Sequence, residues 1–196
     1  MGRAYTDAER EELKIRIKKY GKKMFETEGI KNFRIQKLTG EVGISLGGFY
    51  TFFENKESLY CEIINDEKDR IRSKIINWIQ KDNVTPKEYF MNLANILPEK
   101  AKKNKLYESQ ENGPYNLMSE LIFDIGENNK KENLAFLQRL REIWEKEKNK
   151  INKSNEEVLA ILAILGAICM KQNIMNKEIF KELYEDICIH LIEEIV

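Results

Sequence analysis

The chain has 196 residues, of which 33 are basic and 33 acidic, so its net charge at pH 7 is zero and does not indicate a polyanionic partner. Three widely spaced cysteines and a single histidine disfavour a disulfide framework and a structural zinc site, and we expect the cysteines to be reduced thiols. The longest apolar run, from Val158 to Met170, is shorter than the roughly 18–20 residues that span a bilayer, which predicts a soluble, cytoplasmic protein without membrane contact.

The first predicted helix covers residues 7–27. Thr6 or Asp7 is expected to cap it, and acidic residues occupy its first turn, where they stabilise a helix N-terminus. Its buried face is expected to contain Leu13, Ile17, Tyr20, Met24 and Phe25. Four lysines line another face, and we interpret them as solvated surface: Lys18, Lys19, Lys22 and Lys23.

Residues 35–53 predict two short helices joined by a tight turn. Apolar residues recur at helical spacing and give the first helix one buried stripe, formed by Ile35, Leu38 and Val42. Gly43 follows directly, where a helix end favours a residue that adopts positive φ. Ser45 is then placed to cap a second helix over residues 46–52 by accepting a backbone N–H.

This second helix can bury Phe49 and Phe53 on one side and leaves its other side free. A helix, a short turn with glycine and a second helix is the DNA-binding arrangement in which the second helix enters the major groove. The residues left free are Leu46, Gly47, Gly48, Tyr50 and Thr51. The two glycines each destabilise a helix interior by roughly 1 kcal/mol relative to alanine, which indicates close approach to DNA or to the first helix.

The same residues also fit a second motif. Gly43 to Gly47 matches G-x-S-x-G, the nucleophile turn of α/β-hydrolases, which requires a preceding strand. Residues 36–41 are instead polar with a helical period, and the only histidine, His190, lies in a predicted C-terminal helix. No lysine follows the glycines as a phosphate-binding loop requires. The DNA-binding interpretation is therefore favoured.

Residues 13–60 resemble the DNA-binding domain of the TetR family of bacterial transcriptional regulators. The matching positions are Ile17, Gly21, Phe25, Gly29, Leu38, Val42 to Ser45, Gly48 to Tyr50, Phe53, Lys56, Glu57 and Leu59. Arg34 and Thr39 depart from the family pattern, and Phe52 stands where the family often has a histidine that contacts phosphate.

The resemblance implies that Tyr50 and Lys56 contact DNA phosphates. The alternatives are a half-buried core aromatic for Tyr50 and a free surface lysine for Lys56. Leu46 can offer an apolar contact to a thymine methyl, and Thr51 can donate, accept or pack against a base. The candidate DNA-binding residues are Arg34, Ser45, Leu46, Gly47, Gly48, Tyr50, Thr51 and Lys56.

A long helix over residues 56–81, capped by Asn55, is apolar at both ends and polar over residues 65–70, which indicates that it bridges two cores. We expect a helix-turn-helix DNA-binding domain over 1–57 and a helical regulatory and dimerisation domain over 58–196. The first range has a small basic excess and the second a small acidic excess, as DNA contact at one end favours.

The remaining pattern predicts helices alone and hence an all-α fold. Caps and breaks place these helices at residues 86–97, 98–107, 114–125, 130–150, 155–170 and 177–195. Thr85 with Pro86 opens the first of them, and Ser154 with Glu157 forms a capping box.

Two sets of residues in the second domain are candidates for binding. Aromatic side chains at helical spacing either line a ligand pocket or form plain core, and a carboxylate can orient a cationic ligand. This ligand set is Trp78, Tyr89, Phe90, Tyr107, Tyr115, Glu120, Phe123 and Phe136. Because the helix 158–170 is apolar on every side, a second copy of the chain is expected to cover part of it. Its small residues form the expected dimer strip: Ala160, Ala163, Gly166 and Ala167.

The resemblance implies a homodimeric repressor that binds a near-palindromic operator and is released by a small apolar or cationic ligand. It implies no cofactor, metal or enzymatic activity. An activator, or a regulator of this fold without an effector, is the alternative. A small-molecule-modifying enzyme is disfavoured because no histidine, cysteine or carboxylate cluster has a workable spacing.

Overall fold

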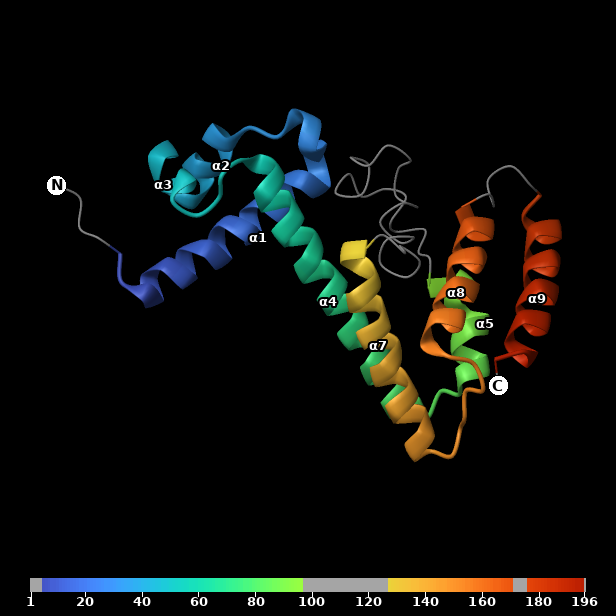
Figure 1. The fold of residues 1–196 in the computed structure, drawn as a ribbon. Coiled ribbons are helices and arrows are strands. Elements are labelled where there is room, and N and C mark those ends of the chain that lie inside the picture. The colour runs from blue at the N-terminus through green and yellow to red at the C-terminus, as the bar shows by residue number, and fades with distance from the viewer. Residues whose placement is uncertain (1–4, 97–126, 171–175, 196) are drawn as a thin grey trace. The chain divides into compact units, whose positions relative to one another are not determined.

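The computed structural model describes residues 5–96, 127–170 and 176–195, and every regular element in these ranges is a helix (Figure 1). The helices are α1 (Asp7–Asn32), α2 (Ile35–Val42), α3 (Leu46–Tyr50), α4 (Lys56–Asp82), α5 (Pro86–Ile96), α7 (Glu127–Lys146), α8 (Asn155–Met170) and α9 (Lys177–Glu193). The predicted all-α fold class is confirmed for this part of the chain. The helices expected over 98–107 and 114–125 lie outside the described residues.

The described residues form two compact units. The N-terminal unit comprises residues 5–69, with α1 to α3 and the first part of α4. The C-terminal unit comprises residues 70–96, 127–170 and 176–195, with the rest of α4, α5 and α7 to α9. The division lies inside α4, within its polar stretch.

Helix α1 begins where the sequence predicts and ends later. The Thr6 hydroxyl accepts from the backbone N–H of Glu9, whose carboxylate accepts from the N–H of Thr6, so a capping box fixes the start. Helical hydrogen bonding continues to Asn32 rather than ending at Thr27, across a kink at Gly29, where φ is 72°. Glycine tolerates this left-handed backbone.

An aromatic cluster forms much of the N-terminal core. The ring of Phe25 stacks on Phe33 at a centroid distance of 4.1 Å and meets the edge of Tyr60 at 5.2 Å. Gly21 lets α4 approach α1 closely, because a Cβ there would lie 3.0 Å from Cδ2 of Leu59. Other fully buried residues of the N-terminal core are Ile17, Leu38 and Phe49.

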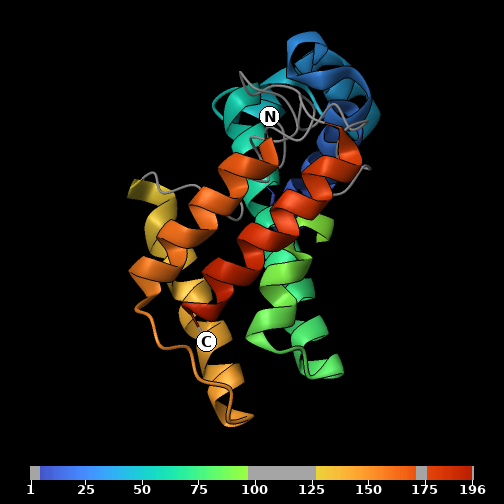
Figure 2. The same ribbon diagram turned by 90° about the vertical axis from the view of Figure 1, so that its right-hand side faces the viewer.

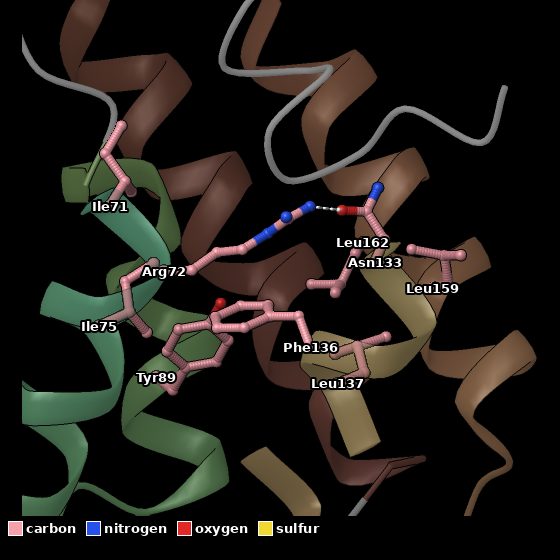
Figure 3. Close-up of a pocket in the computed structure, with 9 residues that line it drawn as sticks. All are labelled: Ile71, Arg72, Ile75, Tyr89, Asn133, Phe136, Leu137, Leu159 and Leu162. Carbon is pink, nitrogen blue, oxygen red and sulfur yellow. Dashed lines mark hydrogen bonds between the residues drawn. The ribbon is translucent and has the colours of Figure 1, made fainter. Parts of the chain in front are cut away.

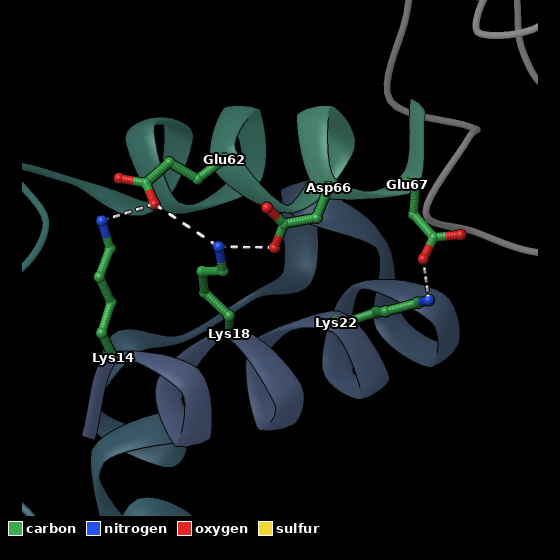
Figure 4. Close-up of polar contacts among 6 residues, drawn as sticks. All are labelled: Lys14, Lys18, Lys22, Glu62, Asp66 and Glu67. Atoms are coloured by element: carbon green, nitrogen blue, oxygen red, sulfur yellow. Dashed lines mark hydrogen bonds and ion pairs between the residues drawn. The ribbon is translucent and has the colours of Figure 1, made fainter. Parts of the chain in front are cut away.

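Ion pairs join α1 to the first half of α4 (Figure 4). Lys14 Nζ lies 2.9 Å from Glu62, Lys18 Nζ lies 2.6 Å from Asp66, and Lys22 pairs with Glu67. The interpretation of the lysines of α1 as solvated surface is therefore wrong for Lys18 and Lys22, whereas Lys19 and Lys23 are exposed. We call the three pairs the α1–α4 ladder.

The C-terminal unit is built around Trp144 of α7. Its indole Nε1 donates to the carbonyl of Val84 at 2.8 Å, and its ring packs against Tyr89 and Phe90 of α5. Both the indole and its hydrogen bond are buried, so the bond ties α7 to the residues that precede α5. Helices α8 and α9 lie side by side (Figures 1 and 2), and α9 also contacts α5.

The helix starts in this unit follow the predicted caps. Thr85 and Ser154 form capping boxes with Glu88 and Glu157, and the Asn176 side chain accepts from the N–H of Glu178. Helix α7 ends at Lys146 rather than Lys150. The chain turns there with Lys148 at φ 63°, and the N–H of Asn149 donates to the carbonyl of Trp144.

Candidate nucleic-acid interface and ligand cavity

The turn between α2 and α3 has the geometry that the sequence predicts. Gly43 adopts φ 78° and ψ 37°, and its N–H donates to the Thr39 carbonyl at 2.9 Å, which closes the end of α2. Ser45 caps α3, because its hydroxyl accepts from the N–H of Gly48 at 3.0 Å. Two local hydrogen bonds therefore fix the angle at which α3 leaves the turn.

Helix α3 is shorter than predicted and ends at Tyr50 rather than Phe52. The hydroxyl of Thr51 donates to the Gly48 carbonyl at 2.7 Å, and the N–H of Thr51 donates to the same carbonyl at 3.3 Å. These bonds use the carbonyl that would otherwise continue the helical ladder. Phe49 and Phe53 are buried as expected.

One side of α3 is open to solvent and carries most of the candidate DNA-binding residues. Leu46 is 40% exposed and Tyr50 is 53% exposed, although both are large and apolar or aromatic. The Tyr50 ring meets the edge of buried Phe49 at 5.4 Å, so its exposed position is fixed by packing. The other exposed candidates on or beside this helix are Ser45, Gly47 and Thr51.

The two glycines of α3 have different surroundings. A Cβ on Gly48 would lie 3.3 Å from the Ser45 hydroxyl oxygen, so a side chain there would crowd the cap. A Cβ on Gly47 would meet no atom within 4 Å among the described residues. The close approach to α1 that the sequence left open is thus absent at Gly47, and nothing within the described chain accounts for a glycine there.

Lys56 is neither a free surface lysine nor fully exposed. Its ammonium donates to the Ile30 carbonyl at 2.9 Å and lies 4.0 Å from Glu57. The lysine therefore stabilises the C-terminal end of α1, where the helix dipole favours a cation. Arg34, which directly precedes α2, is exposed.

Two arginines of α1 approach the helix-turn-helix and were missed by sequence reasoning. Arg16 Nη2 donates to the carbonyl of Val42 at 2.5 Å, and Arg10 Nη2 donates to the carbonyl of Thr51 at 3.4 Å. The Arg10 guanidinium also lies over the ring of Phe52 at 5.2 Å. The two arginines thus place a cation at the C-terminal ends of α2 and α3. This placement depends on how α1 packs, and no local sequence motif indicates it.

A small cavity lies inside the C-terminal unit (Figure 3). Its volume of about 20 Å³ has room for roughly one water molecule. It is lined by Ile71, Arg72, Ile75, Tyr89, Asn133, Phe136, Leu137, Leu159 and Leu162. Burial raises the pKa of Tyr89 far above its usual range, so this side chain stays a neutral phenol.

The predicted ligand residues are only partly brought together. Tyr89 and Phe136 line the cavity. Phe90 is buried in the core beside Trp144, and Trp78 is half-buried with its ring 6.5 Å from Tyr89; neither lines the cavity. The remaining predicted residues lie outside the described part of the chain: Tyr107, Tyr115, Glu120 and Phe123.

Within the described part of α8, the buried and the exposed apolar residues lie on opposite sides of the helix. Val158, Leu159, Leu162 and Leu165 are buried, whereas Ile164 is 52% exposed. On α9, Ile179 and Leu183 are 55% and 49% exposed. Of the predicted dimer strip, Ala160 is exposed and Ala163 half-buried, and the surroundings of Gly166 and Ala167 lie outside what the structure describes.

Within the described ranges, no helix is both long and apolar enough to cross a membrane. Among the same residues, no group of three or more histidine, cysteine, aspartate or glutamate side chains is placed to hold a metal ion.

No family model matches the chain. Among curated proteins it is similar to YuxN of Bacillus subtilis (strain 168), an uncharacterised HTH-type transcriptional regulator, with 27% identity over 89 residues. The match covers 45% of this chain and 30% of YuxN, so the chain spans less than a third of that regulator's length.

Two solved structures are also similar. A transcriptional regulator described as a TetR/AcrR family member shares 15% identity at a TM-score of 0.47, covering 93% of this chain and 96% of that one. A mutant of HlyIIR with an alanine-substituted segment shares 16% identity at a TM-score of 0.37, covering 95% and 97%. At these TM-scores neither structure bears on the fold, which the helices themselves define.

Proposed function

We propose that the chain is a homodimeric transcriptional repressor of the TetR type, which binds a near-palindromic operator and is released by a small ligand. The observation that carries this proposal is the helix-turn-helix geometry of the N-terminal unit. Gly43 and Ser45 fix the turn, and the outer side of α3 is left exposed. A short helix held in this way is suited to enter the major groove of DNA.

The exposed residues of α3 have the chemistry for this role. Leu46 and Thr51 can contact base edges, which specify sequence, and Tyr50 can contact phosphate, which fixes register. Lys56 has two further N–H donors besides the one that it gives to Ile30, so it can bind a phosphate without leaving α1. In this arrangement one lysine both orders α1 and contacts DNA.

Gly47 supplies a separate argument for contact with DNA. A glycine inside a helix costs about 1 kcal/mol relative to alanine. Because a Cβ there meets open space within the described protein, the cost has no internal compensation. An approaching DNA backbone or base would require that open space.

The dimer is supported by the exposed apolar residues of α8 and α9. Ile179 and Leu183 are four residues apart and share one side of α9, while Ala160 and Ile164 share one side of α8 in the same way. The two helices are neighbours (Figure 2), and a second copy would cover these residues through a two-fold interface. Two α3 helices would then be available for two half-sites.

DNA binding is tested with a matched pair of glycine variants. An operator is first selected from random duplexes with the wild-type chain, and its affinity is measured by fluorescence anisotropy. Gly47→Ala should stabilise the fold by up to about 1 kcal/mol and yet weaken operator binding about tenfold or more. Gly40→Ala fills equally open space on α2 and should gain stability without loss of affinity.

Lys56→Gln removes the charge and keeps a donor for the Ile30 carbonyl. It should weaken binding to all duplexes and flatten the salt dependence of log K by about one unit of slope. An unchanged salt slope would remove Lys56 from the interface. Failure of the selection to enrich any duplex, with wild-type protein that is folded, would contradict the DNA-binding function itself.

The dimer is tested by Leu183→Glu, with Ile15→Glu as the control at a similarly exposed isoleucine of α1. A carboxylate inside an apolar interface should shift sedimentation from dimer to monomer, whereas the control should remain dimeric. Helical circular dichroism should persist in both variants. Wild-type protein that sediments as a monomer at micromolar concentration would contradict the interface and the near-palindromic operator.

A further inference from the structure

Arg10 lies on the side of α1 that packs against the rest of the N-terminal unit. Positions 10, 14 and 17 share one side of a helix, and Ile17 on that side is fully buried. The side chain of Arg10 therefore continues the packed side of α1 towards the helix N-terminus, and it is itself exposed. Its position differs from that of an arginine on the solvated side of a helix, so its contacts indicate a role.

Two cations on this side of α1 stack on consecutive aromatic rings. The guanidinium carbon of Arg10 lies 5.2 Å from the centre of the Phe52 ring, and Lys14 Nζ lies 5.7 Å from the centre of the Phe53 ring. The charge of Lys14 is balanced by the carboxylate of Glu62 at 2.9 Å. Arg10, in contrast, forms no ion pair with any residue that the structure describes. Of the two stacked cations, Arg10 is thus the one that can accept an anion from outside.

Most of the hydrogen-bond donors of Arg10 have no partner within the described chain. A guanidinium has five N–H donors, and the hydrogen bond that Arg10 makes there runs from Nη2 to the carbonyl of Thr51 at 3.4 Å, which is long for this type of bond. The Phe52 ring covers a face of the planar group and leaves its edge, where the N–H donors lie, accessible. These donors lie next to the end of α3, where Tyr50 and Thr51 are exposed.

We propose that Arg10 donates to a DNA phosphate beside α3, and that the ring of Phe52 positions its guanidinium for this contact. The inference rests on the proposed DNA-binding function and adds a residue of α1 to the interface. A planar guanidinium can donate two parallel N–H bonds to a phosphate. Because the stack restrains the side chain before DNA binds, less conformational entropy is lost on binding. The bond to the Thr51 carbonyl links this phosphate contact to the helix that faces the bases, so the contact would fix the register of α3.

Arg10→Gln tests the phosphate contact by removing the charge at an exposed helical position. Affinity for the operator selected with the wild-type chain, and for an unrelated duplex, is measured by fluorescence anisotropy at a series of salt concentrations. The variant should weaken binding to both duplexes by a similar factor of about ten, and it should flatten the salt dependence of log K by about one unit of slope. Lys19→Gln is the control and should change neither quantity, because Lys19 is exposed on the opposite side of α1.

Phe52→Leu tests the positioning by the ring, because it keeps an apolar side chain and leaves the charge of Arg10 in place. It should weaken binding about two- to fivefold, as expected from the loss of a cation–π contact at an exposed site, with the salt slope unchanged. Combined with Arg10→Gln, the ring substitution should cause no further loss, since the two residues act through one contact. Losses that multiply in the double variant would overturn the positioning role of Phe52.

A purely structural role of Arg10 predicts a different result. If the arginine only stabilised α3 through the Thr51 carbonyl, Arg10→Gln would reduce the preference for the operator over the unrelated duplex and leave the salt slope unchanged. That result would overturn the inference and leave the DNA-binding function standing, because the wild-type chain would still bind its operator. Failure of the folded wild-type chain to bind any duplex would reject the DNA-binding function and the contact of Arg10 together.

Discussion

In the N-terminal unit the candidate interface is formed by residues between 34 and 56, whereas in the C-terminal unit the cavity draws on residues from Ile71 to Leu162. The interface is an exposed surface that local hydrogen bonds hold in shape, at Gly43, Ser45 and Thr51. The cavity has no such local device. Its shape results from the packing of α4, α5, α7 and α8 against one another.

The two units therefore tolerate different kinds of substitution. Substitutions on the exposed side of α3 alter what the surface can bind and leave the core intact, because the turn stabilises itself. Substitutions of residues that line the cavity, or that pack behind those residues, change the packing of the helices, and any change in binding follows from the changed packing.

Trp144→Ala should have the largest effect on stability. The change removes a fully buried indole and the donor to the Val84 carbonyl, and it should lower the free energy of unfolding by about 3–5 kcal/mol. Hydrogen exchange read by mass spectrometry should show lost protection in α5 and α7. Peptides from α1 to α3 should keep theirs if the two units are stabilised separately.

Trp78→Ala is the control for this change, because it truncates a second indole of the same unit that is only half-buried. It should cost clearly less than Trp144→Ala. Equal loss of protection throughout α1 to α3 in the Trp144 variant would show that the two units unfold together and are not stabilised separately.

The same contrast explains how much of the structure could be predicted from the sequence. The turn at Gly43 and the caps at Ser45, Thr85 and Ser154 follow from residues no more than four positions apart, and the structure confirms each of them. The predicted end of α3 was wrong by two residues because the hydroxyl of Thr51 donates to the carbonyl of Gly48. Whether this bond forms depends on the rotamer of Thr51, which the sequence pattern does not indicate.

Contacts between distant helices could not be predicted in this way. The lysines of α1 have the pattern of a solvated face, and only the packing of α1 on α4 brings Lys18 to Asp66 and Lys22 to Glu67. Arg72 likewise follows a polar stretch and has no local feature that separates it from a surface arginine. Its place in a cavity wall depends on α7 and α8, which are more than 50 residues further along the chain.

The α1–α4 ladder gives the next largest effect, within the N-terminal unit (Figure 4). Lys22→Ala removes one partner of Glu67, a carboxylate that is buried, and should cost about 1–3 kcal/mol of unfolding free energy. Lys14→Ala removes a partner of the half-exposed Glu62 and should cost less than about 1 kcal/mol. Urea unfolding of each variant at low and high salt gives both values.

Salt distinguishes the two ends of the ladder. Screening acts strongly on exposed charges and weakly on buried ones, so high salt should reduce the cost of Lys14→Ala and leave most of the cost of Lys22→Ala. Equal costs for the two variants, with equal salt dependence, would mean that the whole ladder behaves as surface charge and that the N-terminal unit has no buried ion pair of consequence.

The smallest expected effect concerns pH and lies in the C-terminal unit. The backbone N–H and then the hydroxyl of Thr85 donate to Glu88 and lower the pKa of its carboxyl below the usual value of 4.5, and Ser154 lowers the pKa of Glu157 in the same way. A carboxyl whose pKa is lower in the folded state stabilises the fold above its unfolded pKa. That stabilisation is lost as pH falls through the folded pKa.

The double variant Glu88→Gln and Glu157→Gln keeps the reciprocal capping bond, which glutamine can also form, and removes the titrating group. Wild-type protein should lose stability between about pH 5 and pH 3 more steeply than the double variant does, as urea midpoints at a series of pH values would show.

Glu156→Gln removes a neighbouring charge from the same first turn of α8 without touching the capping box, so it controls for the helix dipole. Identical pH slopes for wild type and the double variant would exclude the two capping carboxylates as a source of acid sensitivity. The acid sensitivity of the chain would then have to come from other carboxylates.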